Sequence, residues 1–344
     1  MSNFRNVTGF FIVAISTVFI LIIGKNLFIP FVFALLLWLI VKQMRHLMNR
    51  IKFVKTKVPV WVKNLISFLI ILIVLNFIVN IVYSNFRILA NSYQKYLTNV
   101  DILINSVNET FNIDMMESIK IYFKDFDFGS AVFSLLNYSS NLLGTAFMVI
   151  VYALFIFIEE SSFKKKLEKV FPDSQQFEET YSLIERVESS VSKYLGLKTL
   201  ICLATGILSY IVLLLVGVDF PVFWAFLIFL FNYIPIIGSY VATLLPVIFS
   251  FLQFGSFAPG LLVLICVGVV QVVIGNFIDP RVMGNSINLS PLVIIFSLAF
   301  WGAIWGITGM FLSVPIMVII VIAFSKMPQF RPVAILMSGN GEID

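Results

Sequence analysis

The chain has 344 residues, of which 60% are apolar and only 12% are charged, and its mean hydropathy is +1.02. A water-soluble domain of this size could not bury so much apolar surface. The composition therefore excludes a soluble enzyme, a disordered chain and, despite the net charge of +5, a nucleic-acid-binding protein. The single histidine cannot build a metal site or a catalytic triad, and no GxxxxGK[ST] sequence occurs. We expect an all-α, polytopic integral membrane protein that is not an enzyme and holds no metal or cofactor.

Uncharged runs predict the membrane passes, because about 20 helical residues cross a hydrocarbon core of about 30 Å. In the first half, residues 6–24, 26–41, 64–86 and 128–158 each suit one pass, and the first two are expected to form a tight helical hairpin. In the second half, residues 199–218 suit one pass, 220–278 suit three and 282–325 suit two. The total is about eight, and up to ten, transmembrane or re-entrant helices.

Each long run in the second half contains a break at which the chain would reverse. The first lies at residues 234–238, with Pro235 and Gly238, and the second at 302–309, with Gly302, Gly306 and Gly309. Proline removes a backbone donor and glycine relaxes the chain. We expect broken-helix hairpins whose non-helical turns face a common cavity. Length alone leaves open whether each reversal crosses the membrane or is re-entrant.

The distribution of Lys and Arg predicts the orientation. Residues 42–63 hold seven basic residues and no acid, which is typical of a cytoplasmic loop. Residues 87–127 hold four basic and six acidic residues and are expected outside, and residues 159–198 return inside with seven basic residues. We therefore expect a multi-pass protein with both termini in the cytoplasm.

These patterns divide the chain into five parts. Residues 1–88 form an N-terminal transmembrane scaffold, and 89–130 an extracytoplasmic amphipathic helical segment. Residues 131–198 form a transmembrane helix followed by a cytoplasmic amphipathic helix, 199–326 a transport core with two helical hairpins, and 327–344 a cytoplasmic tail. Apolar residues recur every three or four positions over 93–111 and over 177–194. Both stripes are expected to pack on neighbouring helices or at the lipid interface, and the outer one alternatively makes subunit contacts.

Charges within the membrane are expensive, and residues 199–325 contain only Asp219, Asp279 and Arg281. Asp219 precedes the predicted helix at Pro221 and is expected to be its N-cap. Asp279 and Arg281 flank Pro280. They are expected either to form an ion pair at the cytoplasmic interface or to include a gating or coupling carboxylate.

Polar amides lie near these features. Gln271 and Asn276 precede Asp279 on one helix, and small and polar residues there permit close helix contacts and hydrogen bonds. Asn232 precedes the first break, where unwound backbone could bind a ligand.

Three segments resemble the autoinducer-2 exporter (AI-2E) family. QVVIGNFIDPRVMGNSINLSPLVIIFSLAFWGAIWGITGMFLSVPI (271–316) resembles its signature, NYIPIIGSYVATLLP (232–246) its Ile-Pro-x-x-Gly turn, and VSKYLGLKTL (191–200) the segment that enters the membrane. The resemblance covers the chain in layout and is specific over residues 191–316. The chain departs from the resemblance at Ile274. Many proteins that resemble this family carry an acidic residue at this position, five residues before Asp279.

The resemblance implies a secondary transporter that exports a small polar signal or metabolite such as autoinducer-2, either driven by an ion gradient or facilitated. A sodium (or lithium)/proton antiporter is the alternative, with Asp279 as its titratable group, and a non-transporting scaffold or regulator is the second alternative. The implied partners are a small-molecule or ion substrate, the lipid bilayer and further copies in a homo-oligomer, for which a pentamer is one form. The candidate substrate-binding or gating residues are Asn232, Pro235, Gly238, Gln271, Asn276, Asp279, Pro280, Arg281, Gly284, Pro291, Gly302, Gly306, Gly309 and Pro315.

Overall fold

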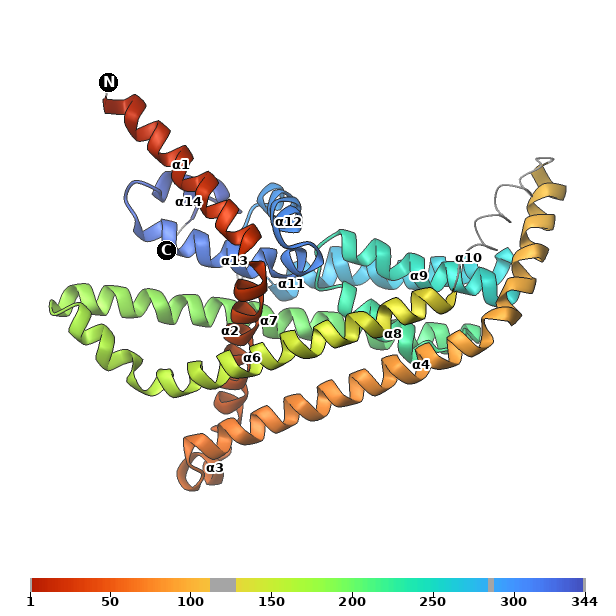
Figure 1. Ribbon diagram of the computed structural model, residues 1–344, viewed down its shortest axis with the longest axis horizontal. Coiled ribbons are helices and arrows are strands. Elements are labelled where there is room, and N and C mark those ends of the chain that lie inside the picture. Colours follow the sequence, from red (N-terminus) through yellow and green to blue (C-terminus); the bar gives the residue numbers. More distant parts are fainter. Residues whose placement is uncertain (1, 112–127, 284–287, 343–344) are drawn as a thin grey trace. The chain divides into compact units, whose positions relative to one another are not determined.

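The computed structural model describes residues 2–111, 128–283 and 288–342, and every regular element within these ranges is a helix (Figure 1). Seven of the described helices are long and apolar enough to cross a membrane: Lys25–Met48, Val60–Asn85, Gly144–Val170, Ser174–Val216, Ile237–Phe254, Phe257–Met283 and Ile307–Lys326. Shorter apolar helices cover Ile12–Ile23, Pro221–Phe231 and Pro291–Trp305. The prediction of an all-α, polytopic membrane protein is confirmed.

The chain divides into two compact units. Unit 1 comprises residues 1–68, 141–195 and 285–344, and unit 2 comprises residues 69–140 and 196–284. The boundaries fall inside helices α4 (Val60–Phe111), α6 (Phe128–Val170) and α7 (Ser174–Val216), so each of these helices contributes to both units. The functional division into a scaffold and a transport core stays a prediction.

In unit 1, α1 (Ser2–Ile23) and α2 (Lys25–Met48) meet end to end at Gly24 (Figure 1). The Gly24 N–H donates to the Ile20 carbonyl at 2.8 Å, and the Phe28 N–H donates to the Gly24 carbonyl at 3.0 Å. Helical hydrogen bonding therefore continues through this residue and leaves no loop that could reverse the chain. The predicted hairpin over residues 6–41 was wrong, because the single glycine bends the helical path without reversing it.

Partly buried charges join three helices of unit 1. On α2, the Trp38 indole N–H donates to Glu160 of α6 at 3.1 Å, and Arg45 forms an ion pair with the same carboxylate. Lys42 forms an ion pair with Glu188 of α7. A short helix, α3 (Lys52–Lys57), connects α2 to α4.

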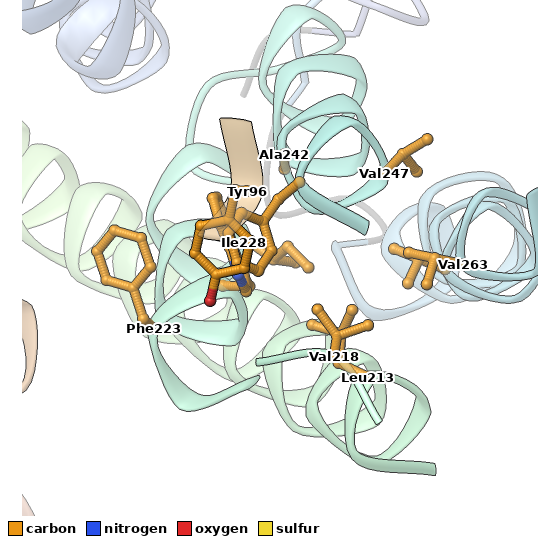
Figure 2. Close-up of a cluster of buried hydrophobic side chains, with 11 residues drawn as sticks. Tyr96, Leu213, Val218, Phe223, Ile228, Ala242, Val247 and Val263 are labelled. Carbon is orange, nitrogen blue, oxygen red and sulfur yellow. The ribbon is translucent and has the colours of Figure 1, made fainter. Parts of the chain in front are cut away.

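Unit 2 is built around α8 (Pro221–Phe231), α9 (Ile237–Phe254) and α10 (Phe257–Val273), and α9 and α10 lie side by side (Figure 1). Its core combines residues from α4 and α7 with these helices (Figure 2). The Phe249 ring lies 5.2 Å from the Tyr96 ring and 4.9 Å from the Trp224 ring, centroid to centroid. The cluster comprises Tyr96, Leu213, Val218, Phe223, Trp224, Ile228, Ala242, Val247, Phe249, Val263 and Val267.

The second half contains a helix at the position of each predicted pass, but two of these helices are not among the candidate membrane spans. Residues 220–278 form α8, α9 and α10 with its π-helical extension η1 (Ile274–Ile278), and residues 282–325 contain α12 (Pro291–Trp305) and α13 (Ile307–Lys326). At about 1.5 Å per residue, the 11 residues of α8 span about 16 Å and the 15 of α12 about 22 Å. Both are shorter than a hydrocarbon core of about 30 Å. These lengths favour re-entrant hairpins over two full crossings.

Candidate functional site

A partly buried ion pair joins α7 to α11 (Asp279–Met283) in unit 2. Lys198 Nζ lies 3.0 Å from Asp279 Oδ2, and only 10% and 25% of the two side chains are exposed. Removal of either partner would leave a desolvated charge uncompensated. The prediction of an ion pair between Asp279 and Arg281 was wrong: the carboxylate pairs with Lys198, 81 residues away, and the Arg281 side chain is exposed.

The chain widens into the π-helical turn η1 immediately before Asp279. Pro280 explains this turn, because it has no amide proton and its ring would clash with the Asn276 carbonyl in a regular α-helix. Gly275 and Asn276 are exposed in the turn. Ile274, which stands where an intramembrane acid would be expected, is only 4% exposed. The polar groups at this turn are therefore its backbone amides and carbonyls and the side chains of Asn276 and Asp279.

The reversal between α8 and α9 is a strained turn. Its non-helical backbone covers residues 232–236, within two residues of the predicted break. Ile236 has φ 63° and ψ −69°, and the Ile237 N–H donates to the Pro235 carbonyl at 2.7 Å, which is a γ-turn with positive φ. A β-branched residue rarely adopts positive φ, and strain of this kind costs about 1–3 kcal/mol. Such strain is commonest at ligand sites and switching segments.

The residues around this turn make specific contacts. The Asn232 side-chain amide donates to the Ile228 carbonyl at 2.7 Å and so completes the end of α8. The Tyr233 hydroxyl donates to Thr199 Oγ1 at 2.7 Å. Since Thr199 follows Lys198, this contact joins the turn to the middle of α7, where the ion pair lies.

Gly238 allows α9 to approach α8 closely. A Cβ atom at this position would lie 1.8 Å from the Phe231 carbonyl oxygen, which is far inside van der Waals contact. Gly238 is therefore required by packing, and it lies within the first turn of α9 rather than in the break itself.

One face of α7 carries a polar seam, defined as Lys198, Cys202, Thr205 and Ser209, all less than 9% exposed. Two contacts relate α7 to the segment that includes α10: Lys198 pairs with Asp279, and Leu213 belongs to the same core cluster as Val263.

Two polar atoms of unit 2, one on α7 and one on α10, lack protein partners. Within the described residues, Ser209 Oγ and Gln271 Nε2 are buried and accept or donate no hydrogen bond. An unsatisfied buried polar group costs about 1–3 kcal/mol, so native structures contain few of them. A polar ligand that reached these atoms would supply the missing hydrogen bonds.

The other end of unit 2 is closed by hydrogen bonds around Asp219. The Tyr96 hydroxyl donates to Asp219 Oδ2 at 3.0 Å, and the Asp219 N–H donates to Gln253 Oε1 at 2.7 Å. Burial, followed by the hydrogen bond to Asp219, raises the pKa of Tyr96 to about 12. The N-cap of α8 is Phe220, and no side chain caps it. The prediction that Asp219 is an N-cap was wrong, because its carboxylate is engaged by a tyrosine 123 residues away.

Unit 1 contains a second hairpin, formed by α12 and α13. The chain reverses at Gly306, whose φ of 63° and ψ of −143° are accessible essentially to glycine alone. A Cβ at Gly309 would lie 1.9 Å from the Trp301 carbonyl oxygen, which repeats the close approach at Gly238. The Trp305 indole N–H donates to the Leu21 carbonyl at 3.0 Å and ties α12 to the end of α1.

The predicted site residues fall into separate groups. Unit 2 contains Asn232, Pro235, Gly238, Gln271, Asn276, Asp279, Pro280 and Arg281. Unit 1 contains Pro291, Gly302, Gly306, Gly309 and Pro315, of which Pro315 is buried inside α13. Gly284 lies outside the described residues. The common cavity for the two breaks stays a prediction.

Sequence reasoning missed Lys198, Thr199, Ser209 and Tyr233. Lys198 was counted among the cytoplasmic basic residues. Its position directly before an uncharged run could have indicated that it is a candidate site residue. Nothing in the sequence distinguishes Ser209 from the other serines of the apolar runs.

Comparisons with known proteins match nearly the whole chain. The family model described as "AI-2E family transporter" matches residues 10–329. A "Putative transport protein" of Haemophilus influenzae is 31% identical over 342 residues, which cover 95% of each chain. A protein of Borreliella burgdorferi with the same description is 34% identical over 226 residues, 63% of this chain and 61% of the relative. The "AI-2 transport protein TqsA" of Escherichia coli is 37% identical over 205 residues, 60% of this chain and 58% of the relative.

Proposed function

Because the chain belongs to the AI-2E transporter family, we propose that this membrane transporter exports a small polar molecule of the autoinducer-2 type. The substrate class is suggested by the E. coli relative, whose name specifies AI-2 transport. We further propose that the protein is a homo-oligomer of the bacterial inner membrane with cytoplasmic termini. The relatives named above are bacterial, and the basic loop at 42–63 supports the orientation.

One observation carries the proposed site: Ser209 and Gln271 each bury an unsatisfied polar atom within the membrane-spanning part of unit 2. A polyhydroxylated substrate can donate and accept hydrogen bonds with both groups. The Lys198–Asp279 ion pair joins α7, which carries Ser209, to the segment that follows α10, which carries Gln271. We assign substrate binding to Ser209 and Gln271 and gating to the ion pair.

The strained α8–α9 turn supports a gating role for the Lys198–Asp279 ion pair. Its γ-turn at Ile236 stores backbone strain, and the Tyr233–Thr199 hydrogen bond tethers it beside Lys198. Loss of that hydrogen bond would cost about 0.5–1.5 kcal/mol. A substrate that competes for the Thr199 hydroxyl would therefore weaken the link between the turn and α7.

The test is autoinducer-2 flux in liposomes containing the purified protein. Ser209→Ala removes a buried hydroxyl that has no hydrogen-bond partner in the protein. A purely structural role therefore predicts equal or higher stability and unchanged flux. A binding role predicts unchanged stability and a KM raised about 3- to 10-fold, the value of one hydrogen bond. Ser250→Ala is the matched control, because Ser250 is equally buried but its hydroxyl donates to the Pro246 carbonyl at 2.7 Å.

The same liposomes test the alternatives. The comparisons do not support the antiporter, since no relative named above is described as exchanging ions. Proton flux that depends on sodium or lithium without autoinducer-2 movement would replace the proposed function by that alternative. Absence of any flux in folded, reconstituted protein would favour the scaffold or regulator.

A further inference from the structure

The connection between α2 and α4 is a helical turn that we call the basic elbow, residues 49–61, with α3 at its centre. Of the seven basic residues in 42–63, three are engaged inside unit 1. Lys42 pairs with Glu188, Arg45 pairs with Glu160, and Lys63, only 4% exposed, donates to Asn49 Oδ1 at 2.8 Å. The remaining four are exposed and all lie in the elbow: Arg50, Lys52, Lys55 and Lys57.

These four cations have no acidic counterpart nearby. The sequence from 42 to 63 contains no Asp or Glu. Across the described ranges, the ion pairs within 4 Å involve other cations. The Lys57 ammonium lies 5.5 Å from the centre of the Phe53 ring, which belongs to the elbow itself. The elbow therefore presents four positive charges outward.

Large apolar side chains are interleaved with these charges. Ile51, Phe53 and Trp61 are 59%, 63% and 68% exposed. A loop surrounded by water would gain nothing from exposing an aromatic pair and an isoleucine. Tryptophan and phenylalanine beside basic residues are typical of segments that lie in the headgroup region of a bilayer.

The backbone of the elbow is anchored at both of its ends. Lys63 of α4 donates to Asn49, and the Arg45 guanidinium of α2 donates to Asn64 Oδ1 at 3.1 Å. The Ile51 N–H donates to the Met48 carbonyl at 3.2 Å and continues the path of α2 into the turn. The cations are thus presented on an ordered scaffold, which reduces the entropy lost when they bind.

We propose that the basic elbow is a binding surface for the headgroups of anionic phospholipids. The cations match the lipid phosphate, and the apolar side chains match the acyl boundary just below it. A soluble anion would make no use of Phe53 and Trp61, and a neutral lipid would leave the four charges without partners. This surface shares no residue with the transport site proposed at Ser209, Gln271 and the Lys198–Asp279 pair.

The test measures the dissociation constant of phosphatidylglycerol from the full-length chain in detergent, by native mass spectrometry, with phosphatidylcholine in parallel. Each cation near an anionic headgroup contributes about 5-fold in affinity, so Lys52→Gln/Lys55→Gln/Lys57→Gln should weaken phosphatidylglycerol binding about 100-fold. Phosphatidylcholine binding should not change. The charge-preserving variant Lys52→Arg/Lys55→Arg/Lys57→Arg should retain the original affinity, which separates loss of charge from loss of folding.

A matched control removes three exposed lysines elsewhere, at the end of α6: Lys165→Gln/Lys166→Gln/Lys169→Gln. This control should keep its phosphatidylglycerol affinity. Equal weakening in the control and the elbow variant would overturn the proposal, because the effect would then reflect net charge alone. Displacement of the lipid by soluble glycerol phosphate at the same concentration would also overturn it, since the surface would then bind a free anion.

Discussion

Gly238 is the position at which the α8–α9 hairpin should tolerate substitution least. The Cβ of Gly238→Ala would lie 1.8 Å from the Phe231 carbonyl oxygen, whereas ordinary contact begins at 3.4 Å. The two helices must therefore separate locally by about 1.6 Å, the difference between these values. Overpacking costs about 1–3 kcal/mol, and the upper value applies because the obstacle is backbone that cannot change rotamer. At about 3 kcal/mol the ratio of folded to unfolded protein falls about 150-fold.

Thermal unfolding of the detergent-solubilised protein measures this effect. Gly238→Ala should lower the midpoint by several degrees, and Gly309→Ala should behave alike because its Cβ would lie 1.9 Å from the Trp301 carbonyl oxygen. Gly268→Ala is the matched control, since nothing lies within 4 Å of its Cβ position and alanine favours the helix by about 0.4–1 kcal/mol. Equal midpoints for Gly238→Ala and Gly268→Ala would refute the close packing of α8 on α9.

Three further predictions concern the Tyr96–Asp219 hydrogen bond, the orientation in the membrane and the assembly. Tyr96→Phe should lower the free energy of unfolding by about 1.5–3 kcal/mol at neutral pH, the value of a hydrogen bond to a carboxylate, as measured by chemical denaturation. Because the pKa of Tyr96 is raised from 10 to about 12, its contribution is complete below pH 10 and is lost as the pH rises towards 12, and Tyr96→Phe should lack this alkaline loss. With both native cysteines replaced, Asn108→Cys should react with an impermeant thiol reagent in intact cells and Lys55→Cys should not, and the reverse result would invert the orientation. Light scattering of the purified protein should give a mass of several copies, whereas a monomer would contradict the proposed homo-oligomer.

The passes and the turns could be predicted because they depend on local sequence. Uncharged runs of sufficient length must cross or enter the membrane, and Pro235, Gly238 and Gly306 mark the positions at which α-helical bonding or packing changes. The hairpin predicted at Gly24 failed for the same local reason: a glycine relaxes the backbone but does not specify a reversal.

The partners of the charged residues could not be predicted from local sequence. Arg281 lies two residues from Asp279 along the chain, yet the carboxylate pairs with Lys198, which is 81 residues away. Asp219 had the sequence context of an N-cap, but Tyr96 approaches it from α4. Contacts of this kind depend on which helix faces pack together. A single sequence with near-uniform apolar helices carries little information about that choice.

The most direct test of the proposed transport site compares the Lys198–Asp279 variants in liposomes by the initial rate of autoinducer-2 flux as a function of pH. Lys198→Gln and Asp279→Asn should each lower the rate at least 10-fold, since each leaves a mostly buried charge without its partner. The double variant removes both charges and should assemble normally, as checked by gel filtration. Its autoinducer-2 flux should stay low if the ion pair acts as a gate. The exposed pair variant Glu159→Gln/Lys166→Gln should transport normally. A double variant that transports at the original rate with the original pH dependence would contradict the account and leave the ion pair as a structural contact.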